Sequence, residues 1–204
     1  MQKYNRDYYD SLDKTYLKIW NLLEAGLKNR DAPFHIPVFI CGDKNKHDAR
    51  IVVLRGISKD KKKIHFHSDI RSNKVKVLKL NSKGALLFYD KTEKVQLRIA
   101  GNAKINYQNS ITKESWKKTA HMSRQCYLGD RPPGADVLEP TSGLSDDINN
   151  YKYTIEESEM GYKNFCVIDF FIESIEWLYL AAKGHRRAFF NLEENKINKK
   201  WLIP

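Results

Sequence analysis

Apolar residues recur at intervals of three and four from residue 12 to residue 29, which predicts an amphipathic helix near the N-terminus. Ser11 stands directly before this segment as a candidate N-cap. The apolar positions on the shared face are Leu12, Tyr16, Ile19, Trp20, Leu23 and Leu27. After residues 31–33, which include Pro33, the hydrophobic period changes to that of strands.

Short β-branched runs separated by polar turns predict strands between residues 36 and 105. The predicted strands are 36–41, 49–58, 62–69, 84–90 and 95–105, with 49–58 and 62–69 forming one hairpin and 84–90 and 95–105 another antiparallel pair. Helical spacing returns at 72–81, where Ser72 is the expected N-cap. Gly101, inside the last strand, predicts a bulge or a close backbone approach.

The second half of the chain alternates between helix, loop and strand signals. A helix is predicted at 111–128, a short helix at 152–162, and four successive strands joined by tight turns at 164–172, 175–182, 186–194 and 195–204. Residues 129–147 are rich in Pro, Gly and Asp, and a loop of this length inside a compact domain is typically functional. These segments predict an antiparallel barrel decorated by helices.

We find no internal repeat and no composition break, which predicts one domain over residues 1–204. Its expected parts are the N-terminal helix at 12–29, a variable lid at 111–163 and C-terminal strands at 164–204. The 41% hydrophobic and 12% aromatic content excludes a disordered chain. No apolar run is long enough to span a membrane, and the polar N-terminus does not read as a secretory signal. Three scattered cysteines suit a reducing compartment, so we expect a cytoplasmic protein.

The net charge of +11 raises the alternative of a nucleic-acid-binding module. Residues 141–204 hold 8 basic and 10 acidic residues, so all of the excess lies in residues 1–140. A binding module would need aromatic residues interleaved with its basic face, and the best cluster is Tyr4, Tyr8 and Tyr9 near Lys3 and Arg6. That cluster is poor, and an unspecific solvated basic surface explains the charge better, so we expect no nucleic-acid partner.

Residues 71–74 form a candidate phosphate site, because they open a helix directly after a strand. A helix N-terminus offers unpaired N–H groups and a partial positive charge. Ser72 adds a hydroxyl, and Arg71 and Lys74 add charges at the same end. Capped helices flanked by basic residues are also common without any ligand.

Two further strands place polar side chains beside core positions. Arg50 and Arg55 bracket an apolar strand, and they would face one elongated ligand only if that strand bulges or the ligand crosses its edge. Gln96 and Arg98 share one strand face, where the Gln96 amide suits the edge of a heterocycle. Alternatively, Arg50 and Arg55 lie at strand ends in water, and Gln96 and Arg98 lie on a strand face that is exposed to solvent.

Histidines and cysteines give weaker signals. His65 and His67 share a strand face, but no further ligand stands at convincing spacing, so we predict no metal site. His185 and Arg187 would share a face after a tight turn at Gly184. Cys126 is more simply an inert thiol than a nucleophile.

The order of these motifs resembles that of the pyridoxamine 5′-phosphate oxidase-like flavoproteins. The resemblance rests on Arg50 to Arg55, residues 66–74, residues 85–90, Gln96 to Gly101, and residues 175–180 followed by His185 and Arg187. It covers about residues 15–110 and 164–204, whereas 111–163 match poorly. It implies a six-stranded antiparallel split β-barrel of Greek-key type, a homodimer, and FMN held at the subunit interface.

The resemblance also implies roles for individual residues. Arg50, Ser72 and Lys74, together with Arg71, would hold the FMN phosphate, and Asn73 and Arg98 belong to the same cofactor-binding motifs. Arg55 would face both flavin and substrate, and His67 and Ser68 stand where the family has a Tyr-Thr pair. Gln96 and Arg187 would meet the flavin from the second subunit, and His185 would face the substrate. Arg55 and His185 are therefore the candidate catalytic residues.

Two departures from the family pattern bear on the substrate. The substrate-phosphate clamp of the oxidases cannot be located in residues 111–130, and Lys183 replaces an arginine of the substrate site. We therefore expect an FMN-dependent oxidoreductase that transfers a hydride between a small substrate and FMN, with little or no turnover of pyridoxine 5′-phosphate. The alternative is a non-catalytic flavin- or haem-binding protein on the same barrel.

Overall fold

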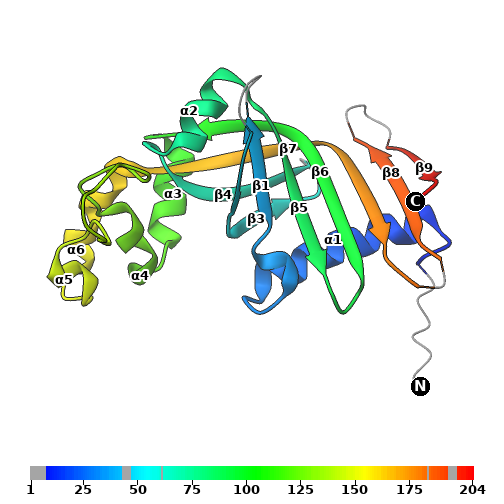
Figure 1. Ribbon diagram of the computed structural model, residues 1–204, viewed down its shortest axis with the longest axis horizontal. Helices are drawn as coiled ribbons and strands as arrows, with labels where there is room; N and C mark the ends of the chain where they lie inside the picture. The colour runs from blue at the N-terminus through cyan, green and yellow to red at the C-terminus, as the bar shows by residue number, and fades with distance from the viewer. Residues whose placement is uncertain (1–7, 43–46, 61, 183, 193–196) are drawn as a thin grey trace.

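The computed structural model describes residues 8–42, 47–60, 62–182, 184–192 and 197–204. These residues form one antiparallel sheet of nine strands with helices around it, which confirms the predicted mainly β class (Figure 1). The strands are β1 Val38–Gly42, β2 His47–Ile51, β3 Leu54–Ser58, β4 Lys63–Asp69, β5 Lys83–Asp90, β6 Val95–Asn106, β7 Phe165–Tyr179, β8 Arg186–Asn191 and β9 Asn198–Leu202.

The strand order is β2-β1-β5-β6-β7-β4-β3, and β8 and β9 extend the sheet from β7. The two ends of the main path, β2 and β3, are consecutive pieces of one chain segment, separated only by Val52 and Val53. The segment therefore bends from one edge of the curved sheet to the other. Because nine strands are described and β2 does not pair with β3 among them, the predicted six-stranded barrel is not confirmed.

The helices lie at the ends and on one side of the sheet (Figure 1). The α-helices are α1 Leu12–Lys28, α2 Asn73–Leu80, α3 Ser110–Lys118, α4 His121–Arg124, α5 Asp146–Asn149 and α6 Ile155–Ser158. Short 3-10 helices are η1 Pro33–His35, η2 Gln125–Tyr127 and η3 Glu159–Asn164. The N-terminal helix and its cap are confirmed, since the Ser11 hydroxyl accepts a hydrogen bond from the Lys14 amide. None of the helices in the described residues is long and apolar enough to cross a membrane.

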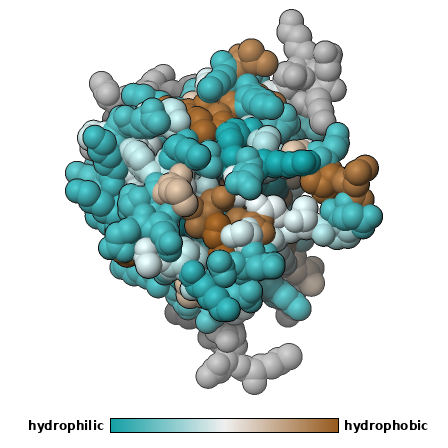
Figure 2. All heavy atoms as spheres, turned by 90° about the vertical axis from the view of Figure 1, so that its left-hand side faces the viewer, coloured by the Kyte–Doolittle hydropathy of each residue, from teal (hydrophilic) through white to brown (hydrophobic). Residues whose placement is uncertain are grey.

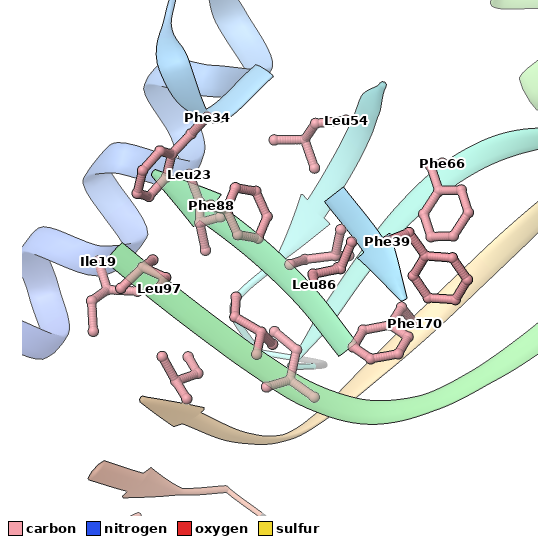
Figure 3. Close-up of a cluster of buried hydrophobic side chains, with 14 of the residues drawn as sticks. Ile19, Leu23, Phe34, Phe39, Leu54, Phe66, Leu86, Phe88, Leu97 and Phe170 are labelled. Atoms are coloured by element: carbon pink, nitrogen blue, oxygen red, sulfur yellow. The ribbon is translucent and has the colours of Figure 1, made fainter. Parts of the chain in front are cut away.

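The main core lies between α1 and the concave side of the sheet. Figure 3 shows Ile19 and Leu23 of α1 packing toward Phe34, Phe88 and Leu97, while Phe39, Phe66 and Phe170 fill the region further along the sheet. These side chains are at most 1% exposed. The predicted apolar face of the helix thus supplies one wall of the core.

One prediction about the strands needs correction, and another is confirmed. Residues 164–182 are not two strands joined by a tight turn, because β7 runs without a break for 15 residues. The chain between the two predicted strands contains no Gly or Pro, and Ser174 pairs with both β6 and β8. The predicted irregularity at Gly101 is confirmed, since the β6–β7 register shifts there. A Cβ at Gly101 would lie 2.0 Å from the Phe171 carbonyl oxygen, so only glycine fits this close approach.

The predicted helix at 111–128 is instead three short helices, α3, α4 and η2. Thr119 ends α3 in an extended conformation. The break lets Trp116 and Tyr127 fold onto Phe165 and Val167, which form a second, smaller hydrophobic cluster. Figure 2 shows this end of the molecule, where hydrophobic patches are divided by hydrophilic side chains. The 129–147 segment is irregular apart from the first residues of α5, as expected.

Tyr8 and Tyr9 are both engaged in contacts within the fold. Tyr9 stacks on Tyr179 at 4.0 Å, and Tyr8 is buried with its hydroxyl donating to Glu93 at 2.9 Å. Both rings also lie against Trp177. Tyr4, Lys3 and Arg6 lie outside the described residues. The predicted stacking platform is therefore not available at Tyr8 and Tyr9.

Candidate functional site

A partly buried cation and two buried hydroxyls meet where β4 leads into α2. Lys74 Nζ donates to Ser68 Oγ at 2.8 Å and to Ser72 Oγ at 3.4 Å, and the two hydroxyl oxygens are 3.2 Å apart. Ser72 occupies the N-cap position of α2 but makes no side-chain cap, because its hydroxyl faces this cluster instead. Both serines are 4% exposed.

The Lys74 ammonium lacks an anionic partner. Within the described part of the chain, no carboxylate lies within ion-pair distance of it. Burial lowers the pKa of Lys74, and the nearby positive charge of Arg50 lowers it further. A bound anion would relieve both effects. Lys74, Ser68 and Ser72 with the α2 N-terminus therefore form a donor set suited to a phosphate.

Arg50 approaches this cluster from β2. Its guanidinium pairs with Asp48 and contacts Cys41 Sγ at 3.5 Å. The chain bends at Val52 and Val53, and its register with β4 shifts after Leu54. The strand is therefore irregular between Arg50 and Arg55, which is the condition under which both could face one ligand. Asn73 is exposed and donates weakly to Asp48 at 3.4 Å.

Arg71 is engaged elsewhere. Its guanidinium donates to both oxygens of the Asp69 carboxylate, from Nη2 to Oδ2 at 2.8 Å and from Nε to Oδ1 at 3.1 Å. It also donates to the Gly129 carbonyl at 3.0 Å. It also reaches the Asp130 carbonyl at 3.3 Å. Arg71 therefore links the start of the 129–147 loop to the β4–α2 connection. Its N–H groups donate to these partners and not into the cluster of Lys74, Ser68 and Ser72.

A pocket of about 590 Å³ lies on the other side of the β4 strand end. Arg55 and His67 both line it, together with side chains from the end of α1 and from α3. His67 Nε2 lies 2.8 Å from Ser115 Oγ, which ties β4 to α3. Burial, followed by the charge of Arg55, lowers the pKa of His67 to about 3. The imidazole is therefore neutral at neutral pH and can either donate or accept one hydrogen bond.

The floor of this pocket holds a carboxylate that sequence reasoning missed. Asp169 of β7 is 3% exposed and lies directly opposite His65 in the β4–β7 register. Its Oδ2 accepts from Asn106 at 3.1 Å, and its Oδ1 lies 3.1 Å from Lys63 Nζ without the geometry of a hydrogen bond. The only available signal was that Asp169 interrupts an otherwise apolar strand.

The remaining predicted residues lie at the opposite end of the long strands. Gln96 pairs with Leu178 of β7, whereas His67 pairs with Val167, so roughly 35 Å of strand separates them. Arg98 and Arg187 both pair with Glu176 there, with Arg187 Nε at 2.9 Å. His185 is exposed and accepts a hydrogen bond from the Ala181 amide. One chain therefore brings together Arg50, Ser68, Ser72 and Lys74, and separately Arg55 and His67. The residues at the opposite end of the strands join neither group within one chain; they are Gln96, Arg98, His185 and Arg187.

The arginine of residues 111–130 is engaged within the protein. Arg124 is 4% exposed, pairs with Glu159 at 2.5 Å and lies over the Trp116 ring at 4.7 Å. Cys126 is exposed, and Lys183 lies outside the described residues. In the part of the chain that the structure describes, no three His, Cys, Asp or Glu side chains are arranged to hold a metal ion.

Comparison with known proteins places these motifs in a family. Residues 20–107 match the family described as pyridoxamine 5′-phosphate oxidase, FMN-binding domain. The matched region holds Arg50, Ser72 and Gln96, so it is similar to that family over the motifs described above. The whole chain is also similar to pyridoxine/pyridoxamine 5′-phosphate oxidase from Psychrobacter cryohalolentis, at 28% identity over 92% of this chain and 87% of the relative. The resemblance predicted from the sequence is confirmed.

Solved structures share the fold of this chain. A pyridoxamine 5′-phosphate oxidase-related, FMN-binding protein from Nostoc punctiforme superposes with a TM-score of 0.73 at 15% identity, covering 92% of this chain and 96% of that one. PhzG from Burkholderia lata, solved with tetrahydrophenazine-1-carboxylic acid, gives 0.69 at 18% identity, covering 98% and 96%. At these identities the likeness concerns the fold alone.

Proposed function

We propose that the protein binds FMN and places the cofactor phosphate at Lys74, Ser68, Ser72 and the N-terminus of α2. The observation that carries this proposal is the partly buried Lys74 ammonium, which has two hydroxyl partners and no carboxylate partner within the described residues. The family match over residues 20–107 supports FMN as the anion. Arg50 would exchange part of its contact with Asp48 for the phosphate.

We further propose that two copies of the chain complete the site. In one copy, Gln96, Arg98 and Arg187 lie too far along the strands from His67 to meet the same mononucleotide. A second copy would bring them to the flavin ring, as the resemblance implies. In this assembly β1, the bent β2–β3 segment and β4–β7 would be the six strands of the split barrel.

The proposed activity is oxidoreduction of a small substrate. Bound FMN supplies hydride-transfer chemistry by itself, so the protein has to bind, orient and exclude water. Arg55 would bind an anionic group of the substrate. The neutral His67, held by Ser115, would orient a polar group in the same pocket. His185 would act from the second subunit.

The direct test is release of the chromophore. Purified protein is heat-denatured, and the supernatant is examined for flavin absorbance and for FMN mass. We expect the supernatant to contain FMN, or the protein to take up FMN on incubation. Analytical ultracentrifugation should show a dimer. A colourless protein that gains no flavin absorbance in excess FMN would contradict the proposal.

Two other functions have some support. The name of the Psychrobacter relative favours oxidation of pyridoxine or pyridoxamine 5′-phosphate. The second alternative is a non-catalytic flavin or haem carrier, which would bind its cofactor but would not reduce it with any small substrate. Reduction of bound FMN under anaerobic conditions separates a carrier from an enzyme.

A further inference from the structure

Two arginines surround one carboxylate where β6, β7 and β8 lie side by side (Figure 1). In the β6–β7 register, Glu176 lies directly opposite Arg98. In the β7–β8 register, Arg187 lies opposite Leu178, which makes it a diagonal neighbour of Glu176 on the same face. Trp177, between them on β7, is fully buried on the core side. Glu176 and both arginines therefore lie on the outer face of the sheet.

The Glu176 carboxylate binds both arginines through one oxygen. Its Oε1 accepts a hydrogen bond from Arg187 Nε at 2.9 Å and also pairs with Arg98 Nη2. The Glu176 side chain is 16% exposed, against 29% for Arg187 and 51% for Arg98. The carboxylate is thus the most enclosed of the three groups, and it carries one negative charge for two positive ones.

Arg187 is held by only one of its nitrogen atoms. Its guanidinium makes no other hydrogen bond or ion pair with the residues that the structure describes. Both Nη groups therefore keep their N–H donors, while the bond from Nε fixes the direction of the guanidinium plane. An arginine that is already fixed loses less side-chain entropy on binding a ligand than an unrestrained one.

We propose that Glu176 is a positioning residue, which holds Arg187 so that its Nη groups meet acceptor atoms of the flavin ring bound by a second copy of the chain. This inference rests on the proposed function, in which Arg187 reaches the flavin from the second subunit. The carbonyl oxygens of a flavin accept hydrogen bonds near the plane of the ring, so they require donors of fixed direction. Arg98, on the adjacent strand, would keep the Glu176 carboxylate in place.

The test compares the affinities for FMN and riboflavin in the wild type and in Glu176→Ala. Because Arg187 would contact the ring and not the phosphate, both affinities should fall by the same factor, on the order of fivefold. Fluorescence quenching titrations measure both. No loss in Glu176→Ala, or a loss confined to FMN, would overturn the proposal.

Glu173→Ala is the matched control for the loss of a carboxylate from β7. Glu173 bonds to Asn102 and, among the described residues, pairs with no arginine. Its removal should change neither flavin affinity by more than about twofold, which is the range expected for a substitution away from the ligand. A loss in Glu173→Ala equal to that in Glu176→Ala would overturn the proposal.

A double-mutant cycle with Arg187→Ala separates positioning from a general effect on the fold. Since Glu176 would act through Arg187, Glu176→Ala should change the flavin affinities by less than about twofold when Arg187 is already absent. A weakened sheet would instead give the same loss in both backgrounds, which would overturn the proposal. Wild-type flavin affinity in Arg187→Ala would overturn it too, because no ring contact would then depend on this arginine.

Glu176→Gln takes the place of Glu176→Ala in the same cycle should the alanine variant fail to fold. The amide oxygen can still accept from Arg187 Nε but carries no charge, so we expect a loss of about threefold that again requires Arg187. No loss, or an equal loss without Arg187, would overturn the proposal. Failure of the wild-type protein to bind FMN would contradict the proposed function, whereas wild-type FMN binding that does not depend on Glu176 would contradict only this inference.

Discussion

Lys74 Nζ donates to the hydroxyl of Ser68 at 2.8 Å and has no carboxylate partner among the described residues. The Ser72 hydroxyl completes a cluster of donors around the start of α2. If this cluster holds the FMN phosphate, as we propose, its loss should affect only ligands that carry a phosphate.

The double variant Ser72→Ala, Lys74→Ala should therefore weaken FMN binding much more than riboflavin binding. Losing one charged hydrogen-bond partner of a phosphate costs about 1.5–3 kcal/mol, which is at least tenfold in affinity. Fluorescence quenching titrations with both flavins measure the difference. Lys76→Ala, at an exposed position of the same helix, serves as the control. Equal losses for FMN and riboflavin would mean that the phosphate binds elsewhere.

Arg71→Ala should loosen the 129–147 loop without a comparable loss of FMN affinity. Arg71 links Asp69 to the carbonyls of Gly129 and Asp130, so its removal detaches the loop from the β4–α2 connection. Limited proteolysis should cut the variant within this loop several times faster than the wild type. Arg131→Ala, whose guanidinium bonds only to the loop's own Asp136 carbonyl, is the control. A tenfold loss of FMN affinity with unchanged proteolysis would instead restore the phosphate role predicted from the sequence.

The sequence predicted the local features of this site better than their combination. Helical spacing and the Ser72 cap position correctly located α2, and the alternation of Gln96 and Arg98 with buried Val95, Leu97 and Ile99 holds in the sheet. Whether Ser68 and Lys74 meet depends on the angle between β4 and α2, which no periodicity encodes. Arg71 pairs with its neighbour Asp69 in the folded chain, a contact that the spacing of the motif does not predict.

Burial patterns explain the larger errors. The first residues of β7 are buried on both faces, because Trp116 and Tyr127 cover one face and the main core covers the other. A strand buried on both faces loses the alternation that marks its length. The role of Asp169 could not be predicted either, because its partners Lys63 and Asn106 come from two other strands.

His67 should make the folded state sensitive to mild acid. Its pKa is lowered to about 3 from an ordinary value near 6.5, mainly by burial. The unfolded chain therefore binds more protons at this site between these values, so stability is lost as pH falls from about 6.5 toward 3. The slope from one such histidine is at most about 1.4 kcal/mol per pH unit.

Urea unfolding at several pH values measures this dependence. His67→Gln should flatten the profile between pH 6.5 and 5, whereas His47→Gln, at an exposed position, should leave it unchanged. An unaltered slope in His67→Gln would show that other groups dominate acid unfolding. A direct check is the His67 imidazole NMR signal, which should not titrate above pH 5.

Gly101→Ala should destabilise the fold by about 1–3 kcal/mol, because the added methyl group meets the Phe171 carbonyl at 2.0 Å. Relieving that overlap requires separation of β6 from β7 at the bulge. Chemical denaturation measures the loss. The neighbouring substitution Ala100→Ser adds an atom at an exposed position and should change stability by less than about 0.5 kcal/mol. Similar effects for the two substitutions would show that the close approach is not what requires glycine.

Turnover of pyridoxine 5′-phosphate should be weak or absent, even in protein fully loaded with FMN. A substrate phosphate needs free cationic donors, and Arg124, the only arginine of residues 111–130, is buried. Its donors are used by Glu159, Ser158 and the Trp116 carbonyl. Freeing it would break its ion pair with the half-exposed Glu159 and its hydrogen bonds to Ser158 and the Trp116 carbonyl.

The decisive measurement is anaerobic mixing of the FMN-loaded protein with pyridoxine 5′-phosphate, followed by the absorbance of the oxidised flavin. We expect bleaching far slower than about 1 per second, the lower end of ordinary enzyme turnover. Dithionite, which reduces flavin without binding a substrate pocket, is the control for a reducible cofactor. Bleaching at enzymatic rates with formation of pyridoxal 5′-phosphate would mean that Arg55 and the lysines around the pocket suffice as a phosphate clamp. The protein would then share the activity named for its Psychrobacter relative.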